Sequence, residues 1–166
     1  ETASVLCDYD GTNDYLSSAD AAFNFTGSFS VGAWIHLTDF ATVLTAGIVT
    51  RSGATPNGWR LRGSTAEEIR FETLSGGVVT TDVRAVVGHL PAGWHFIVAT
   101  YNSAGNSIIY VDGVPRKSGT SGALAQEGSL EVGSYNGGTN KNTARICEVF
   151  VHNGTDSDKL TDECVP

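Results

Sequence analysis

The fold class of this chain is decided by the stretch Phe29-Ser30-Val31-Gly32-Ala33-Trp34-Ile35-His36-Leu37. Every second residue from Phe29 to Leu37 is apolar and forms one set, while the intervening positions hold Ser, Gly, Trp and His. Strict alternation of this kind is typical of a β-strand whose two faces meet different surroundings. Because Trp34 lies opposite the apolar set, we expect both faces to contact other parts of the protein, as in a strand of a two-sheet sandwich.

Short segments of similar character recur along the chain, separated by clusters of Gly, Pro, Asn and Ser. Asp112-Gly113 predicts a tight reversal into residues 114–116, and only 157–163 has a locally helical pattern. Many short strands without crossover helices predict an all-β antiparallel sandwich or barrel and exclude a parallel α/β sheet. The expected strands cover 4–9, 29–37, 47–51, 58–62, 69–73, 78–83, 94–101, 107–111, 130–134 and 145–151.

Composition narrows the class of protein further. The chain has 166 residues and a formal net charge of −8, which argues against binding to the phosphate backbone of a nucleic acid. A hydrophobic fraction of 40% with only 17% charged residues is typical of a globular protein and not of a disordered one. We therefore expect one acidic β domain spanning residues 1–166.

The chain offers no targeting or membrane signal. No apolar stretch reaches the length of a membrane helix, so we expect a soluble protein without membrane insertion. The chain starts at Glu1 without an initiator methionine, so we expect Glu1 to be a processed or artificially cut end, and a signal, propeptide or neighbouring domain upstream of it is compatible with the sequence. Three cysteines without CxxC spacing exclude a cysteine-based zinc site and allow at most one internal disulfide.

Five motifs in order carry a resemblance to a known family. They are 10–15 (DGTNDY), 29–34 (FSVGAW), 93–101 (GWHFIVATY), 110–113 (YVDG) and 130–133 (LEVG). In sequence and spacing they resemble the laminin-G-like members of the concanavalin A-like lectin/glucanase superfamily. The resemblance extends along nearly the whole chain, with 47–51 and 58–61 at the positions of the next strand pair and 146–151 at the closing strand.

The resemblance implies a jelly roll of two curved antiparallel sheets, with the first and last strands adjacent in one sheet. It implies core positions for four aromatic residues and sharp turns or positive φ at three glycines. A disulfide between Cys7 and Cys147 is then one hypothesis, and a bridge from Cys147 to Cys164 is the other. The aromatic residues are Trp34, Trp94, Tyr101 and Tyr110, and the glycines are 11, 113 and 133.

The sequence gives little support to catalysis. Hydrolases of the superfamily place carboxylates at every second position of one strand, and the comparable cluster here is 67–72. Glu68, Arg70 and Glu72 share one face, so a cation lies between the two carboxylates and predicts an exposed ion-paired face. The histidines 36, 89, 95 and 152 show no paired spacing, and His95 belongs to a Trp-His motif that is structural in the family. We therefore predict no enzyme activity and no catalytic residue.

A bound calcium ion is a further hypothesis, and no cofactor is required. Laminin-G-like domains often bind calcium, and Asp10, Asn13 and Asp14 supply oxygen ligands in one loop. The same residues suit a turn without any ion, because Asx side chains hydrogen-bond to nearby backbone. Cys147, next to Glu148, occupies a position that is acidic in many relatives.

Two functions are compatible with these features. For both of them we expect the protein to lie outside the cell or on the surface of a cell or virion. The first is a lectin-like module for carbohydrate binding or adhesion, with Trp59, Tyr135 and Asn136 as ligand-binding candidates because they lie in polar, turn-rich loops. For Trp59 the alternative is a core position, and for the 134–140 loop with Tyr135 and Asn136 the alternative is a flexible connector. The second function is a structural or protein-interaction domain, such as a virion decoration or fibre protein or a cell-envelope component. The expected partners are a glycan or a surface protein, no nucleic acid, and a homo-oligomer or larger assembly.

Overall fold

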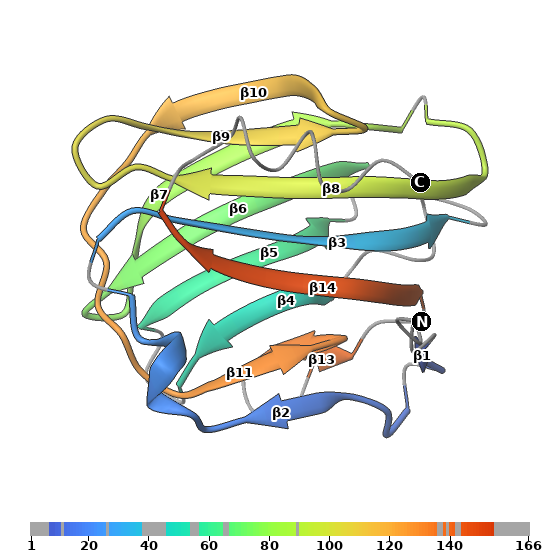
Figure 1. The fold of residues 1–166 in the computed structure, drawn as a ribbon, viewed down its shortest axis with the longest axis horizontal. Helices are drawn as coiled ribbons and strands as arrows, with labels where there is room; N and C mark the ends of the chain where they lie inside the picture. The colour runs from blue at the N-terminus through green and yellow to red at the C-terminus, as the bar shows by residue number, and fades with distance from the viewer. Residues whose placement is uncertain are drawn as a thin grey trace.

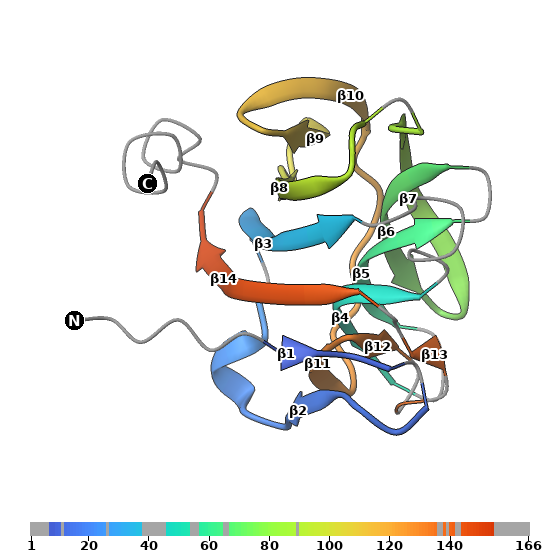
Figure 2. The ribbon, with the colours of Figure 1, turned by 90° about the vertical axis from the view of Figure 1, so that its right-hand side faces the viewer.

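The computed structural model describes residues 7–10, 12–25, 27–37, 46–53, 57–64, 67–88, 90–135, 138, 140–141 and 144–154. Two six-stranded antiparallel sheets face one another (Figures 1 and 2), which confirms the predicted jelly-roll sandwich of the concanavalin A-like type. Among these residues, no helix is long and apolar enough to cross a membrane.

The first sheet, sheet A, has the strand order β1-β14-β3-β8-β9-β10. The pairing of β1 with β14 confirms that the first and last strands are neighbours. In chain order these strands are β1 (Cys7–Asp8), β3 (Phe29–Leu37), β8 (Gly93–Tyr101), β9 (Asn106–Val111), β10 (Val114–Thr120) and β14 (Arg145–Asn153).

The second sheet, sheet B, has the strand order β2-β11-β4-β5-β6-β7. A separate two-stranded ribbon pairs β12 (Ser134–Tyr135) with β13 (Asn140–Lys141), and a 3₁₀ turn, η1 (Ala21–Phe23), precedes β3. In chain order the strands of sheet B are β2 (Leu16–Ser18), β4 (Gly47–Ser52), β5 (Gly58–Ser64), β6 (Glu68–Ser75), β7 (Val78–Val86) and β11 (Ser129–Val132).

The core lies between the sheets and is filled by the apolar alternating positions of both. Phe29 is at its centre, with ring centroids of Trp59 at 5.3 Å, Tyr101 at 5.4 Å and Phe71 at 6.1 Å. All five apolar positions of β3, the set that alternates from Phe29 to Leu37, are at most 2% exposed. The alternation of β3 therefore predicts its buried face correctly.

Three of the four aromatic residues expected in the core lie elsewhere. Only Tyr101 is buried in the core, at 4% exposure, whereas Trp94 is 40% exposed and Trp34 and Tyr110 are half-buried. Cross-strand pairing puts Trp34 opposite Phe96, and residues opposite one another share a face, so both rings lie on the outer side of sheet A. The core prediction is wrong for Trp34, Trp94 and Tyr110 because large rings can also pack on one another across the outside of a sheet.

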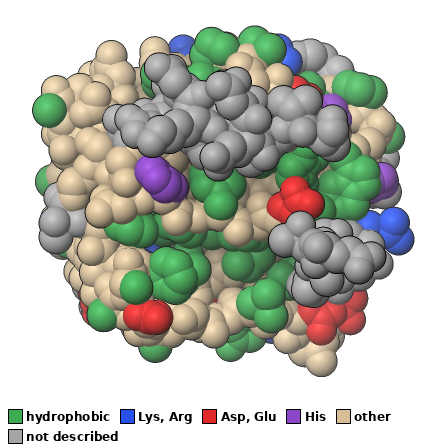
Figure 3. All heavy atoms as spheres, in the orientation of Figure 1, with side chains coloured by type: hydrophobic (Ala, Val, Ile, Leu, Met, Phe, Trp, Pro, Cys, Tyr) green, Lys and Arg blue, Asp and Glu red, His purple; other side chains and the backbone are tan. Residues whose placement is uncertain are grey.

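These outer rings form what we call the aromatic face of sheet A, made of Trp34, His36, Trp94, Phe96 and Phe150. Trp34 and Phe96 lie 5.2 Å apart, His36 and Trp94 5.2 Å, and Phe96 and Phe150 5.9 Å between ring centroids. Figure 3, which looks onto this side, shows hydrophobic side chains with few charged ones among them.

Turn geometry explains several of the sequence motifs. Asp112 and Gly113 have φ of 53° and 74°, so the tight reversal predicted between β9 and β10 is confirmed, and positive φ at both central residues suits the twist of a hairpin. Gly133 has φ of 79° and divides the predicted strand 130–134 into β11 and β12. Gly11 and 157–163 lie outside the described residues.

The register near the chain closure bears on the disulfide hypotheses. Cys7 lies opposite Ile146, one position away from Cys147, and Cys147 lies opposite Trp34 on the other side of β14. Cys164 lies outside the described residues. Both pairings therefore stay predictions.

Candidate functional site

Trp59 does not lie where a ligand could reach it. Its side chain is fully buried in β5, 5.3 Å from Phe29 between ring centroids. Cross-strand pairing with Thr73 and Arg51 places Trp59 on the core side of sheet B. A ligand-binding role for Trp59 is incompatible with this placement, and the core position is the correct alternative.

Tyr135, in contrast, lies on the outer side of sheet B. It is half-buried at the end of β12, and its ring contacts the guanidinium of Arg60, which lies 5.1 Å from the ring centroid. Asn136, the third ligand-binding candidate, lies outside the described residues. Of the three candidates, only Tyr135 is therefore placed by the structure on a polar surface.

The ribbon that carries Tyr135 is fixed by buried polar contacts. The hydroxyl of Thr50 donates to the carbonyl of Ser134 at 2.9 Å, and the hydroxyl of Ser134 donates to Glu131 at 2.7 Å. The backbone amide of Gly138 also donates to Glu131, at 3.3 Å. Thr50 and Ser134 are fully buried and Glu131 is 3% exposed, so these bonds are shielded from water and hold the Tyr135 end of the ribbon in place.

Next to Tyr135, the outer side of β5, β6 and β7 carries three arginines in a row. Arg62 lies opposite Arg70, and Arg70 lies opposite Arg84, so the three side chains share one face. In the adjacent row, Arg60 lies opposite Glu72, which lies opposite Asp82. We call this set the arginine patch; it consists of Arg60, Arg62, Glu68, Arg70, Glu72, Asp82 and Arg84.

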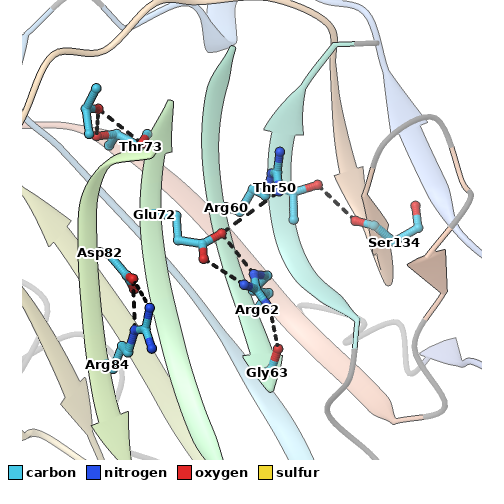
Figure 4. Close-up of polar contacts among 10 residues, drawn as sticks. Thr50, Arg60, Arg62, Gly63, Glu72, Thr73, Asp82, Arg84 and Ser134 are labelled. Atoms are coloured by element: carbon cyan, nitrogen blue, oxygen red, sulfur yellow. Dashed lines mark hydrogen bonds and ion pairs between the residues drawn. The ribbon is translucent and has the colours of Figure 1, made fainter. Parts of the chain in front are cut away.

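Each arginine of the row has its own carboxylate partner (Figure 4 shows two of the pairs). Arg62 donates to both carboxylate oxygens of Glu72, at 2.9 and 2.6 Å. Arg84 pairs with Asp82 from two of its nitrogens. Arg70 donates to Glu68 at 3.0 and 2.9 Å. These pairs offset the repulsion between like charges that face one another across strands.

Ionisation in the patch follows these contacts. Hydrogen bonds to Glu72 raise the pKa of the Arg62 guanidinium. The pKa of the Asp82 carboxyl is lowered, chiefly by the hydrogen bond from Arg84. Burial lowers the pKa of the Arg60 guanidinium, and Glu72 only partly offsets this effect. Arg60 is thus the cation of the patch that is least compensated within the protein.

The carboxylates of the predicted ion-paired face are more buried than expected. Glu68, Arg70 and Glu72 share a face as predicted, but Glu72 is 4% exposed and pairs with Arg62 of the neighbouring strand, not with Arg70. The prediction of an exposed face is therefore wrong for Glu72, because the long arginine side chains of β5 cover it.

The predicted calcium loop contains an Asx turn. The carboxylate of Asp10 accepts from the backbone amide of Thr12 at 2.7 Å, and the amide of Asp10 lies 3.4 Å from an Asp14 carboxylate oxygen. The hydrogen bond from Thr12 lowers the pKa of the Asp10 carboxyl. Asp10 and Asn13 are exposed and Asp14 is half-buried. The turn that these residues form without an ion is thus observed, and calcium binding stays a prediction.

His95 belongs to the framework of the fold. Its ring is 6% exposed, with Nδ1 at 2.8 Å from Asp112 and Nε2 at 2.9 Å from the carbonyl of Pro91. Asp112 also accepts from the backbone amide of Phe96 at 2.9 Å. These contacts tie the β9–β10 turn to β8, in agreement with the structural role expected for His95.

Sequence reasoning missed most of the arginine patch. Arg60, Arg62 and Arg84 were not singled out, because their proximity depends on the register of three strands and not on any spacing along the chain. The buried contacts of Thr50, Glu131 and Ser134 were missed for the same reason. Charged residues alternate with other residues in 60–62, 68–72 and 82–84, and this alternation is the sequence signal that marks the outer side of β5, β6 and β7.

Solved structures with the same fold are binding domains of larger proteins. The receptor-binding domain of botulinum neurotoxin C/D mosaic serotype superposes with a TM-score of 0.71 at 12% identity, over 92% of this chain and 40% of that one. A second structure comes from botulinum neurotoxin type C, whose cell entry depends on interaction with two ganglioside molecules. It superposes with a TM-score of 0.66 at 12% identity, over 95% of this chain and 45% of that one. The binding domain of botulinum neurotoxin DC in complex with rat synaptotagmin II gives 0.66 at 14% identity, again over 95% and 45%.

This chain spans less than half the length of those neurotoxin domains, and the likeness shows the fold alone. No curated protein sequence gives a significant match.

The two antiparallel sheets define a β-sandwich of the concanavalin A-like type. Residues 10–159 match the Laminin_G_3 model of the concanavalin A-like lectin/glucanases superfamily, and the chain belongs to this family.

Proposed function

We propose that this chain is a non-catalytic module that binds carbohydrate through the outer side of sheet B. The observation that carries the proposal is the contact between Tyr135 and Arg60 at the edge of the arginine patch. Sugar recognition needs an aromatic ring for the apolar face of the sugar and fixed polar groups for its hydroxyls. Tyr135 supplies the ring, and neighbouring guanidinium and carboxylate groups supply donors and acceptors.

The ion pairs favour binding over catalysis. A glycoside hydrolase needs one carboxylate to act as an acid and a second as a base or nucleophile. Both oxygens of Glu72 accept hydrogen bonds from Arg62, at 2.9 and 2.6 Å, and Glu68 is paired with Arg70. Both carboxylates are therefore engaged as acceptors for arginine side chains, so neither is free to contact a leaving group or a water molecule as a catalytic carboxylate must.

Relatives in fold support a role in surface recognition. One of them is a receptor-binding domain, cell entry of a second toxin depends on interaction with two ganglioside molecules, and a third binding domain forms a complex with rat synaptotagmin II, although this chain corresponds to only part of each. We propose accordingly that the module acts outside the cell or on the surface of a cell or virion.

A glycan array with the purified chain tests the proposal. We expect binding that Tyr135→Ala abolishes without loss of the far-ultraviolet circular dichroism of the fold. Tyr110→Ala is the matched control, because Tyr110 is a half-buried tyrosine on the outer side of the other sheet. A blank array, or equal losses in the two variants, would contradict carbohydrate binding at Tyr135.

A second function, as a structural or protein-interaction module, is favoured by the aromatic face of sheet A. Trp94 is 40% exposed there and Trp34 and Phe150 are half-buried, and aromatic residues are enriched in protein interfaces. Sedimentation of the native chain and of Trp94→Ser separates the two proposals. Self-association that Trp94→Ser removes, together with a blank glycan array, would favour the second.

A further inference from the structure

The arginine patch concentrates positive charge on an acidic protein. Four of the chain's ten lysines and arginines lie on β5, β6 and β7, where only three carboxylates accompany them, while the whole chain carries −8. Three of these arginines lie directly opposite one another, an arrangement that disfavours folding unless anions compensate it. The patch is thus one anion short of neutrality.

Arg60 is the member of the patch that lacks a close anion. Its Nη1 lies 4.0 Å from Glu72, whereas Arg62 lies 2.6 Å from the same carboxylate. Arg60 is only 9% exposed, and its Nε is a buried atom without a hydrogen-bond partner. The charge of this guanidinium is therefore only partly compensated by Glu72, and an anion at the 11% of the side chain that remains exposed would compensate it further.

The composition of the patch favours an acidic sugar over other anions. Guanidinium donors alternate with the carboxylates of Glu72 and Asp82, which can accept from hydroxyls but repel a polyphosphate. The ring of Tyr135 beside Arg60 offers a surface for a sugar ring, and Arg84, with 48% of its side chain exposed, extends the patch to solvent. An acidic sugar has each of these features: an anionic group, hydroxyls and an apolar ring face.

We infer that the arginine patch binds the carboxylate or sulfate of an acidic polysaccharide, with Arg60 as its anchor and Tyr135 against the sugar ring. This inference rests on the proposed carbohydrate-binding function and names the class of glycan. Guanidinium groups suit both anions because their planar fork donates two parallel hydrogen bonds.

Calorimetric titration with four polymers tests the inference. Polygalacturonate carries carboxylates, dextran sulfate carries sulfates and no carboxylates, dextran is the matched neutral polysaccharide, and duplex DNA is a polyanion whose sugar rings are not exposed for stacking. We expect polygalacturonate or dextran sulfate to bind at least tenfold more tightly than dextran, and to bind more weakly as the salt concentration rises. The preferred acidic polymer identifies the anion.

Three variants locate the site. We expect Arg60→Gln to weaken binding of the acidic polymer roughly tenfold or more, since hydrogen bonds to charged groups contribute about 1.5–3 kcal/mol. Because Arg60 is buried, Arg84→Gln serves as a second, more exposed test. Arg60→Lys keeps the positive charge but loses the planar pair of donors of the guanidinium, so we expect an affinity between those of the native chain and Arg60→Gln. Arg116→Gln, an exposed arginine on β10 of the other sheet, is the matched control and should bind like the native chain.

The outcomes separate the inference from the function on which it rests. Binding to dextran that depends on Tyr135, with no preference for acidic polymers, would overturn the acidic-glycan inference and leave carbohydrate binding standing. Equal binding to DNA, or equal losses in Arg84→Gln and Arg116→Gln, would also overturn it, because charge alone would then explain the binding. No binding to any glycan would contradict the proposed function itself.

Discussion

The guanidinium of Arg60 lies over the ring of Tyr135, 5.1 Å from the ring centroid. Arg60 is held in β5 and Tyr135 in the ribbon that follows Gly133, so this contact joins the outer side of sheet B to the segment beside it. The contact can be tested for stability independently of any ligand.

We expect a coupling free energy of about 0.5–1 kcal/mol between Arg60 and Tyr135, the size of a partly exposed cation–π contact. Urea unfolding of Arg60→Gln, Tyr135→Leu and the double variant measures it as a double-mutant cycle. A cycle that pairs Arg60→Gln with Tyr110→Leu is the control and should show no coupling. Zero coupling in the first cycle would mean that the two groups are only near neighbours.

The ion pair between Asp82 and Arg84 should account for part of the loss of folding stability at low pH. Because the pKa of Asp82 is lower in the folded protein than in the unfolded chain, its contribution is present above the unfolded pKa of about 3.9 and is lost as pH falls through the folded pKa. Both side chains are partly exposed, so we expect a contribution of about 0–1 kcal/mol. We expect thermal melts to show a smaller loss of stability for Arg84→Ala than for the native chain as the pH falls from 5 to values below about 3.9. An equal loss would exclude this pair as a cause.

Ionisation of Tyr101 should reduce the folding stability of the protein at high pH. Burial raises the pKa of its hydroxyl, which donates to the carbonyl of Gly122 at 2.7 Å. The neutral form is therefore favoured in the folded state, and its contribution is complete below the unfolded pKa of about 10 and is lost as pH rises through the folded pKa. We expect Tyr101→Phe to lose about 1 kcal/mol at pH 7 and to be less sensitive to alkali. Chemical unfolding at pH 7 and above pH 10 measures both effects, and parallel curves for the two proteins would contradict the assignment.

Trp59 and Trp94 should differ strongly in their contribution to stability. Trp59 is fully buried, so Trp59→Ala should cost about 3–5 kcal/mol and can prevent folding. Trp94 is 40% exposed and keeps an edge contact with His36, so Trp94→Ala should cost only about 1 kcal/mol. Thermal melts of both variants make the comparison, and similar losses would contradict the burial described for Trp59.

The Asp10 loop should be stabilised by its own turn. Because the Asp10 carboxylate accepts from the Thr12 amide, we expect Asp10→Ala to lower the melting temperature by the same amount in calcium and in chelator. Asp20→Ala, which removes a similar Asx contact to Ala22 at η1, is the control. A melting temperature that rises with calcium in the native chain, but not in Asp10→Ala, would favour the calcium hypothesis instead.

The sequence predicts the core of the fold well and the candidate site poorly, for a physical reason. Alternation along one strand reveals which residues share a face, and it correctly separates Phe29 from Trp34. It does not reveal what covers the second face. The core position expected for Trp34 comes from the family resemblance, whereas Trp34 lies half-buried on the outer side of sheet A. The arginine row needs a further fact, the pairing of Arg62, Arg70 and Arg84 across strands, and register is fixed by the whole sheet. Strands of two or three residues, such as β2, β12 and β13, are too short to show any alternation.

The row of Arg62, Arg70 and Arg84 runs across the strands, and this direction has a consequence for protein engineering. Its spacing equals the distance between hydrogen-bonded strands, about 4.8 Å, and is held by main-chain bonds that side-chain changes leave intact. Exchanging these three residues would therefore alter the chemistry of the surface without altering its repeat. Strands β5 to β7 thus form a hydrogen-bonded template on which the side chains of this surface can be exchanged one position at a time.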